Sequence, residues 1–338
     1  MNDYRFILDT KNKKFVCPEC NRKTFVRFID NSTNEYLPEK YGRCDREQKC
    51  NYFLNPYKDG YSKMIWEKKK GIPTDIKNKQ SLPILKQDIK EPASIPFEIL
   101  KATRKGYEQN VFIQNLLHNI PFTFTAKEIE QIISLYQLGT VCKGYRKGAI
   151  TFPFIDIKGN VRAVQAKQFD KMNHTTSTDF LHSMYKKDCE KNNKPLPEWL
   201  SNYLLNDKKI SCLFGEHLLS KCPTNPIALV EAPKTAIIAS LYFGFPDNPK
   251  NFIWLGVYNL SSLNIAKCKV LQGRKVFLFP DLNAFDNWSK KANNFQKEMP
   301  DTTFKVSYLL QNHASKEEKE NGFDIADFLI HLNWRDFR

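Results

Sequence analysis

The chain has 338 residues, enough for two or three domains, and its 41% hydrophobic content argues against general disorder. The formal net charge of +15 favours a polyanionic partner such as DNA or RNA, although a basic surface that only aids solubility would give the same count. No apolar run approaches the ~18 residues of a membrane span, and the first residues lack a secretory signal, so we expect no membrane partner. Nine cysteines, an odd number, predict a reducing, cytoplasmic setting without a disulfide framework.

Residues 1–66 are predicted to form a small β domain, a zinc ribbon. Short β-like runs alternate with turn residues, and Cys17-Pro-Glu-Cys20 has the spacing of a zinc knuckle. Cys44 and Cys50 are separated by five residues and complete a set of four thiolates. Such a set leaves no open coordination position, so the predicted Zn²⁺ is structural and stabilises a domain with little apolar core. The alternative is four reduced thiols that share one region by coincidence.

Cations and aromatic rings alternate around the second cysteine pair. The predicted nucleic-acid contacts are Arg43, Arg46 and Lys49, and the rings between them are Tyr41, Tyr52 and Phe53. Cations suit phosphates and exposed rings suit base stacking. The alternative is a solvated rim of cations over aromatic residues that belong to the core.

Residues 67–95 are predicted to be a basic linker, because lysines and prolines recur there without apolar periodicity. Residues 96–222 are predicted to be a basic α+β domain. The expected elements are a helix opened by the capping box Thr125–Glu128, a β-hairpin of residues 149–156 with 161–169, and a short helix over 195–205. Arg162 and Lys167 on the hairpin are further predicted nucleic-acid contacts.

Residues 223–338 are predicted to be an α/β domain, because strands alternate with helices there. The expected strands are 227–231, 252–255, 275–280 and 302–308, and the expected helices are 234–243, 260–267, 284–297 and 324–332. This alternation is typical of a mainly parallel sheet with helices on its faces, and the segment is too short for a barrel. We therefore expect a compact doubly wound domain.

Two of these strands end in a carboxylate, Glu231 and Asp281, and open α/β sheets bind their ligands at the carboxyl edge. Asn283, Asp324 and Asp327 offer further oxygen ligands, so the set could hold a hard divalent cation such as Mg²⁺. Each acid has a plainer alternative, because a carboxylate at a helix start also serves as a cap or a dipole partner.

Other residues of this segment carry weaker signals. Lys234 and Lys275 are candidate phosphate contacts, and Asp286 is interpreted as a surface residue of the following helix. The sequence has no Walker-type phosphate loop, so ATP-driven motor activity is not supported.

Several blocks resemble bacterial primases of the DnaG type, which carry a toprim domain. The cysteine cluster stands where those primases have a zinc-binding domain. The blocks similar to the basic subdomain are Tyr136-Gln-Leu-Gly139, Ala149–Asp156 and Val161-Arg-Ala-Val164. The blocks similar to toprim motifs are Val230-Glu231, Pro280-Asp-Leu-Asn283 and Phe323-Asp-Ile-Ala-Asp327. Gly42–Cys50, Phe214–Leu219, Val230–Ala236 and Phe279–Asp281 are similar to zinc-ribbon/toprim proteins of bacterial mobile elements.

The resemblance implies Mg²⁺ or Mn²⁺ at the toprim acids and nucleotidyl transfer, or phosphodiester hydrolysis, at that edge. Glu231 would act as acid/base or metal ligand, and Asp281 would bind the metal. The sequence departs from the family twice. Asn283 stands where toprim domains have a second aspartate, and the turn Leu255-Gly-Val-Tyr-Asn259 lacks the usual small residues. Asp324 or Asp327 would have to compensate for the missing charge.

Three functions remain open at this point. The first is a primase-like nucleotidyltransferase of a mobile element, which binds single-stranded DNA and nucleotides and works beside a helicase or another replication protein. The second is a non-catalytic, zinc-dependent nucleic-acid-binding protein with a degenerate toprim fold. The third is a toprim nuclease, which ranks last because no tyrosine among the 14 is singled out for strand cleavage.

Overall fold

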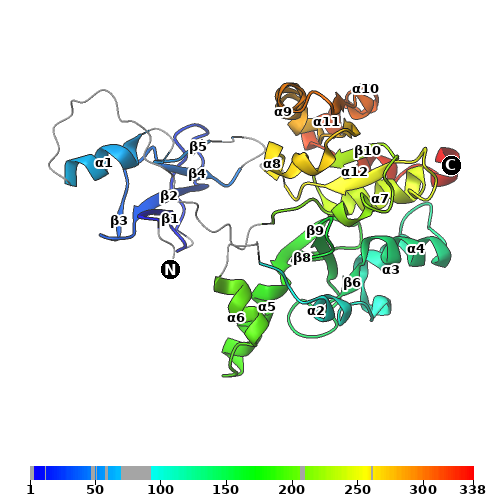
Figure 1. Ribbon diagram of the computed structural model, residues 1–338, viewed down its shortest axis with the longest axis horizontal. Helices are drawn as coiled ribbons and strands as arrows, with labels where there is room; N and C mark the ends of the chain where they lie inside the picture. The colour runs from blue at the N-terminus through cyan, green and yellow to red at the C-terminus, as the bar shows by residue number, and fades with distance from the viewer. Residues whose placement is uncertain are drawn as a thin grey trace. The chain divides into compact units, whose positions relative to one another are not determined.

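The computed structural model describes residues 4–11, 13–46, 50, 52–57, 60–69, 93–205, 210–259 and 262–338. The chain divides into two compact units, residues 1–89 and 90–338 (Figure 1). Most of the predicted linker and the predicted contact Lys49 lie outside the described residues. None of the described helices is long and apolar enough to cross a membrane.

The first unit is a small antiparallel β domain, as the sequence predicts. Its sheet contains β1 (Phe6–Leu8), β2 (Phe25–Asp30), β3 (Glu35–Tyr36), β4 (Gly42–Cys44) and β5 (Phe53–Leu54), in the order β1-β2-β4-β5 with β3 paired to β2. The helix α1 (Tyr61–Lys69) follows and extends past residue 67, where we placed the start of the linker. Among the described residues, the domain's apolar core consists of two small clusters, one of Phe6, Phe28, Leu37 and Tyr41 and one of Phe25 with Cys17 and Cys44. A domain with so small an apolar core is only marginally stable without a further contribution, which a bound metal would supply.

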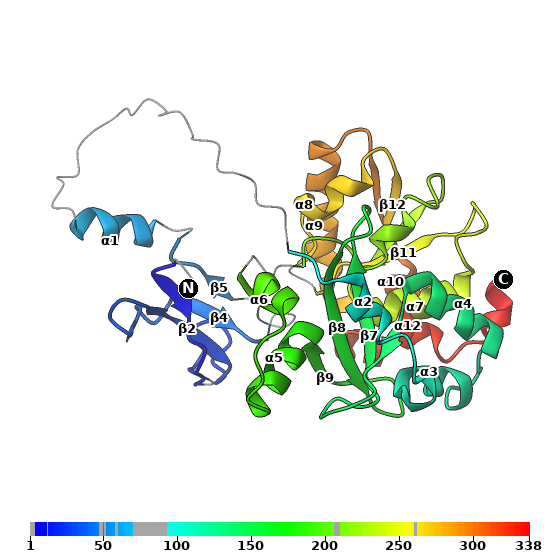
Figure 2. The ribbon, with the colours of Figure 1, turned by 60° about the horizontal axis from the view of Figure 1, so that its bottom comes forward.

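The second unit begins with an antiparallel sheet. Its strands are β6 (Gly139–Thr140), β7 (Ile150–Ile155), β8 (Val161–Phe169) and β9 (Thr175–Phe180), in that order, and β7 with β8 is the predicted hairpin. Figure 2 shows α3 (Val111–His118) on one side of these strands and α5 (Leu181–Lys191) with α6 (Glu198–Leu205) on the other. The predicted capping box opens α4 (Ala126–Tyr136), and α2 (Phe97–Lys101) lies beside β8.

A parallel sheet completes the second unit. Its strands are β10 (Ile227–Val230), β11 (Ile253–Gly256), β12 (Lys275–Leu278) and β13 (Thr303–Val306), in the order β11-β10-β12-β13. Every neighbouring pair is parallel, which confirms the predicted sheet. The helices are α7 (Pro233–Phe243), α8 (Ile265–Cys268), α9 (Phe285–Glu298), α10 (Leu309–His313), α11 (Lys316–Asn321) and α12 (Ile325–Leu329). All residues of β10 and β11 are buried, as expected for a sheet covered on both faces.

The two sheets of the second unit share one hydrophobic core. Tyr136 at the end of α4 is fully buried, and its ring stacks on Phe214 at a centroid distance of 5.0 Å. Its hydroxyl donates to the carbonyl of Trp254 on β11 and lies 2.8 Å from Ser240 on α7. A buried hydroxyl with two partners fixes the antiparallel part against the parallel part. The predicted boundary at residues 222/223 therefore falls within a single packed unit.

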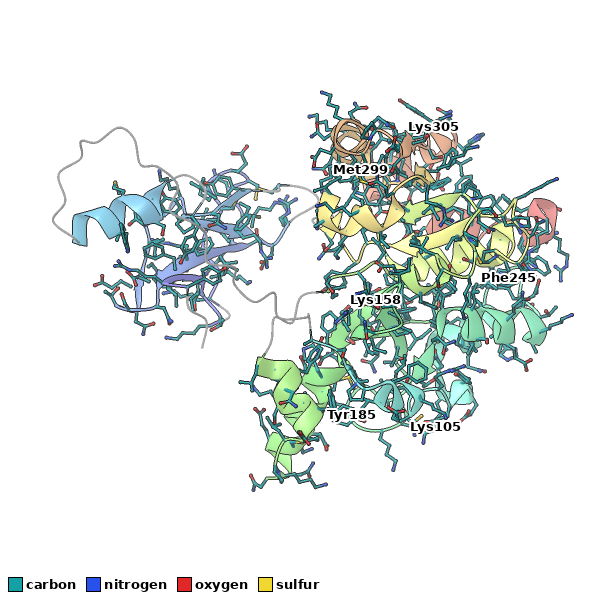
Figure 3. All side chains as sticks on the ribbon, viewed as in Figure 1. Lys105, Lys158, Tyr185, Phe245, Met299 and Lys305 are labelled. Carbon is teal, nitrogen blue, oxygen red and sulfur yellow. The ribbon has the colours of Figure 1, made fainter. Side chains whose placement is uncertain are left out.

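Exposed lysines occur on several segments of the second unit. Figure 3 labels Lys105, Lys158 and Lys305, which are exposed on three different segments. The whole chain has 52 lysines and arginines against 37 aspartates and glutamates, an excess of positive charge that suits an anionic partner.

Candidate functional site

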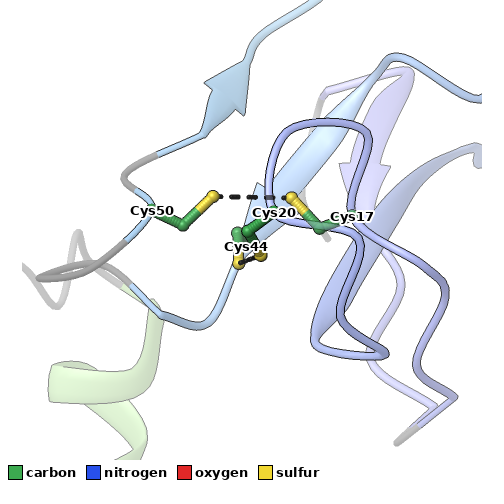
Figure 4. A group of neighbouring side chains, drawn as sticks. All are labelled: Cys17, Cys20, Cys44 and Cys50. Atoms are coloured by element: carbon green, nitrogen blue, oxygen red, sulfur yellow. Dashed lines mark hydrogen bonds between the residues drawn. The ribbon is translucent and has the colours of Figure 1, made fainter.

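The four predicted cysteines of the first unit converge on one point, which we call the ribbon site (Figure 4). The sulfur atoms of Cys17 and Cys50 are 3.6 Å apart, and those of Cys20 and Cys44 are 3.9 Å apart. Four sulfurs at ~2.3 Å around a tetrahedral Zn²⁺ would be separated by about 3.8 Å. The donor set and its spacing therefore fit zinc, as the sequence predicts.

The protonation of these thiols is uneven without a metal. A backbone hydrogen bond from Arg22 and contacts with the other thiols lower the pKa of Cys20 to about 6, against the opposing effect of burial. Burial and the neighbouring sulfurs raise the pKa of Cys50 to about 12. Zinc binding requires thiolates, so it must release protons from this cluster.

The predicted nucleic-acid contacts of the first unit differ in exposure. Arg43 on β4 is exposed and is paired in register with Phe53 on β5, whose exposed fraction is 48%. Phe53 also stacks on Phe28 at a centroid distance of 6.3 Å. Arg46 is half-buried, whereas Tyr41 is a core residue with an exposed fraction of 2%. Arg43 and Phe53 thus offer a cation and a ring on one face, and for Tyr41 the core alternative holds.

Glu231 and Asp281 follow adjacent strands of the parallel sheet. In the register of β10 with β12, Leu229 pairs with Leu278, and the amide of Phe279 donates to the carbonyl of Leu229 at 2.8 Å. Both carboxylates therefore lie at the carboxyl edge of the sheet. Burial raises the pKa of Asp281 well above its usual value, and neighbouring carboxylates, Glu231 first, raise it further. This is the electrostatic environment of acids that lie close together with too little positive charge nearby.

Asp324 and Asp327 lie near the same edge at the start of α12. Asp324 is the N-cap residue, and the two aspartates form a reciprocal capping box. Lys234 on α7 donates to Asp327 at 2.9 Å and lies 3.5 Å from Asp324. Burial raises the pKa of Asp324, but Lys234 and hydrogen bonds outweigh it, and the pKa falls below its usual value. We call the four carboxylates Glu231, Asp281, Asp324 and Asp327 the acid edge.

The potential ligand atoms of the acid edge are less closely clustered than those of the ribbon site. Within the part of the chain that the structure describes, only the four cysteines form a group of three or more metal-binding side chains whose ligand atoms lie within 4.8 Å of one another. Asn283 is exposed and lies against Gly322, where an added Cβ would come within 1.9 Å of the Asn283 amide nitrogen. Asn283 therefore packs on the backbone that leads into α12.

The basic residues predicted to bind nucleic acid are placed differently from one another. Arg162 is buried, and its Nε and Nη2 each lie 2.7 Å from Asp156, so it forms an internal ion pair and does not present its charge on the surface. Lys167 on β8 is half-buried near the acid edge. Burial lowers the pKa of Lys167, Lys234 lowers it further, and Glu231 acts in the opposite direction. Lys275 begins β12 and so lies at the amino end of that strand, away from the acid edge.

Sequence reasoning missed Lys291 and Thr235. Lys291 is half-buried on α9, where burial lowers its pKa while Cys268 and Glu231 act in the opposite direction. Thr235 is buried and donates from its hydroxyl to Asp324 at 2.8 Å. The spacing of Lys291 three residues after the buried Trp288 was a usable signal, because it places the lysine on the inward face of α9.

Each of the two units is matched by a family model. A model described as "Domain of unknown function (DUF6371)" matches residues 110–282, which is more than half of the chain. The chain belongs to this family. The match runs from the N-cap of α3 through the antiparallel sheet and the strands β10, β11 and β12 to the residue after Asp281. A second model, a zinc beta-ribbon finger, matches residues 4–64 and so agrees with the ribbon site.

Comparison with other proteins gives weaker likenesses. No curated protein matches the chain. The primase fragment of the bacteriophage T7 primase-helicase is 11% identical, with a TM-score of 0.32 over 94% of this chain and 99% of the fragment. The zinc-binding and RNA polymerase domains of the Aquifex aeolicus primase are 12% identical, with a TM-score of 0.39 over 98% and 79%. These values are low, so neither likeness establishes a shared fold or a shared function.

Proposed function

We propose that this chain is a primase-like nucleotidyltransferase of a bacterial mobile element. It binds single-stranded DNA and nucleotides, and its parallel sheet is of the toprim type with Mg²⁺ or Mn²⁺ at the acid edge. The observation that carries the proposal is the placement of Glu231 and Asp281 at the ends of adjacent parallel strands, with the lysines Lys167 and Lys291 nearby. Ligands of open α/β sheets bind at this edge.

The donor set of Glu231 and Asp281 fits a magnesium ion. Mg²⁺ is commonly held by one or two carboxylates together with waters and substrate phosphates, so it does not need a closed cage of protein ligands. The raised pKa of Asp281 supports this fit, because two half-buried carboxylates that repel each other gain from a shared cation. A divalent cation bound there would supply neutralisation of phosphate charge and orientation of the attacking oxygen.

The chain's own residues would position the substrate. Lys167 and Lys291 carry ammonium groups close enough to Glu231 to interact with it electrostatically, so both suit the phosphates of a bound nucleotide. In the first unit, Arg43 suits a backbone phosphate and the exposed ring of Phe53 suits a stacked base. Together these residues account for binding of a strand and binding of a nucleotide.

Primer synthesis on single-stranded DNA with ribonucleotides tests the proposal. Glu231→Gln removes one charge from the acid edge, and we expect product to fall by roughly a hundredfold or more. Asp286→Asn is the matched control, because Asp286 is an exposed carboxylate on the first turn of α9. It should retain full activity. The proposal fails if the wild type makes no product with Mg²⁺ or Mn²⁺, or if Glu231→Gln matches it.

A non-catalytic, zinc-dependent nucleic-acid-binding protein is the second candidate. It is favoured by the ion pairs of Lys234 with Asp324 and Asp327, which leave fewer free carboxylates than an active toprim site would offer. Asn283 in place of an acid points the same way. Tight DNA binding without metal-dependent product in the same assay would select this candidate, whereas measurable turnover would exclude it.

A further inference from the structure

A cavity of about 530 Å³ lies in the second unit and borders the acid edge. Its walls come from the residues that follow α3, the turn between β8 and β9, and the helices α7 and α12. Asp327 of the acid edge lines it together with its ion-pair partner Lys234. We call this cavity the amide pocket, after Asn119 and Asn173 in its wall. Its volume is within the range of sites that bind small organic ligands.

Three asparagines form a relay of hydrogen bonds that ends at this wall. Asn119 donates from Nδ2 to Oδ1 of Asn115 at 2.8 Å, and Asn115 donates from Nδ2 to Oδ1 of Asn173 at 2.8 Å. Asn115 also donates from Nδ2 to the backbone carbonyl of Asp170 at 2.8 Å. A carbonyl oxygen can only accept, so this bond fixes which end of the Asn115 amide is the donor. It thereby fixes which end of the Asn173 amide accepts.

The relay leaves the Nδ2 group of Asn173 as a donor without an acceptor. Asn173 is only 2% exposed, and within the part of the chain that the structure describes its Nδ2 has no hydrogen-bond partner. The backbone of Asn173 has a φ of +60°, in the left-handed region that asparagine adopts more readily than most residues. A buried donor without an acceptor is unfavourable, so at the wall of a cavity it points to a ligand that supplies the acceptor.

The rest of the wall combines a small positive charge with an apolar surface. Lys234 and Asp327 pair with each other, so the charge in excess comes from Lys171, which is exposed on the turn between β8 and β9. The apolar part of the wall consists of Ile120, Pro121, Ile238, Phe323 and Ile330. The matching ligand has an apolar ring, hydrogen-bond acceptors on that ring and one anionic group. A nucleoside monophosphate has this chemistry.

We propose that the amide pocket is a mononucleotide-binding site. Asn173 donates from Nδ2 to an acceptor of the base, the apolar wall covers the ring, and Lys171 contacts the phosphate. The inference rests on the proposed function for the choice of a nucleotide over other organic anions. It deepens that function, because a nucleotide bound in this pocket lies beside Asp327 and hence next to the acid edge.

Isothermal titration calorimetry of the full, zinc-loaded chain with each of the four ribonucleoside monophosphates, in buffer without divalent cations, tests the inference. We expect at least one of them to bind the wild type. Asn173→Asp keeps the oxygen that Asn115 uses and replaces the donor by a charged oxygen, so it should weaken binding by roughly tenfold or more. Asn193→Asp is the matched control, because Asn193 is exposed and also has a left-handed φ, of +49°. It should bind like the wild type.

Lys171→Ala keeps the inference testable if Asn173→Asp does not fold, because Lys171 is exposed. It should weaken binding of the monophosphate by about threefold and leave binding of the same nucleoside without phosphate unchanged. The inference is overturned if no monophosphate binds the wild type. Unchanged binding of the monophosphate in either folded variant would overturn it as well.

The calorimetry measures no product, so its outcome is separate from that of the primer-synthesis assay. Binding that depends on Asn173 in a chain that makes no primer would support the pocket and reject the proposed function. Primer synthesis by a wild type that binds none of the monophosphates would reject the pocket and leave the proposed function intact.

Discussion

The ribbon site and the acid edge are both clusters of potential metal ligands, but they balance their charge in different ways. The four cysteines converge with sulfur separations of 3.6 and 3.9 Å. The acid edge has four carboxylates, and Lys234 already neutralises part of their charge. Four identical thiolates that fill every coordination position suit a structural ion. Carboxylates that leave coordination positions open, and whose charge is partly neutralised by a lysine, suit a metal that also binds a substrate.

Removal of zinc should have the largest effect, because it should unfold the first unit and leave the second unit folded. Zinc sites of this kind contribute about 10 kcal/mol to folding, and the apolar core of the first unit is small. We therefore expect Cys17→Ser to unfold residues 1–66 while residues 90–338 stay folded. Two-dimensional NMR of the full chain would show both units at once. Cys142→Ser, which changes a cysteine outside the cluster, is the control and should leave both units folded.

Loss of Lys234 should have the next largest effect. Lys234→Met leaves the buried Asp324 and the half-buried Asp327 without their cation, which costs about 3–5 kcal/mol. Urea denaturation in EDTA-free buffer without divalent cations would measure this loss. Lys234→Arg should recover most of it. A Lys234→Met variant as stable as the wild type would mean that the ion pairs contribute nothing and that the acid edge resembles an open metal site throughout.

The exposed ring of Phe53 should matter for binding and not for folding. Stacking of one base on an aromatic ring contributes about 1–3 kcal/mol, so Phe53→Ala should weaken single-stranded DNA binding by roughly 5- to 150-fold. Fluorescence anisotropy with a labelled oligonucleotide measures the change. Tyr308→Ala, which removes an exposed ring from the second unit, is the matched control. Equal losses in both variants would argue against a specific role for the ribbon face.

Arg43 should act through charge alone. Its removal in Arg43→Ala deletes one phosphate contact, so the slope of log affinity against log salt should fall in magnitude by about 0.7 for a single strand. The same anisotropy assay over a range of salt concentrations gives the slope. Lys305→Ala changes an exposed lysine of the second unit and serves as the control. An unchanged slope would remove Arg43 from the binding face.

Mild acid should affect the ribbon site before it affects the second unit. Zinc needs thiolates, and the pKa of Cys20 is about 6. Cys50, with a pKa of about 12, already carries a proton that zinc must displace at neutral pH, and Cys20 adds another below about pH 6. The apparent affinity for zinc should fall about tenfold per pH unit for each proton displaced, so it should fall more steeply below pH 6. Zinc release measured with a chromogenic chelator between pH 7 and about 5 would follow this. Release that does not depend on pH would contradict a cysteine-bound ion.

The sequence predicts best what depends on neighbouring residues. The capping box of Thr125 with Glu128 and the β7–β8 hairpin are set within a few residues and match the structure. The alternation of strands and helices likewise predicts the parallel sheet and hence the edge on which Glu231 and Asp281 lie. The pairing of Asp156 with Arg162 across the hairpin was within reach, because the two residues flank the same turn.

What the sequence could not predict depends on contacts between distant residues. Lys234 and Asp327 are 93 positions apart, and only the packing of α12 on α7 brings them together. From the sequence, Tyr41 is a candidate for base stacking, but in the structure it is buried against Tyr61 and Phe28. The short helices α10 and α11 have too few residues for a periodic pattern to identify them.

The position of a bound metal tests the central claim most directly. Crystals of the zinc-loaded chain soaked in Mn²⁺ would show each manganese as an anomalous-difference peak. We expect one peak between the carboxylates of Glu231 and Asp281, with Lys234 still paired to Asp324 and Asp327. A peak between Asp324 and Asp327 with Lys234 displaced, or no peak at the acid edge, would contradict the account.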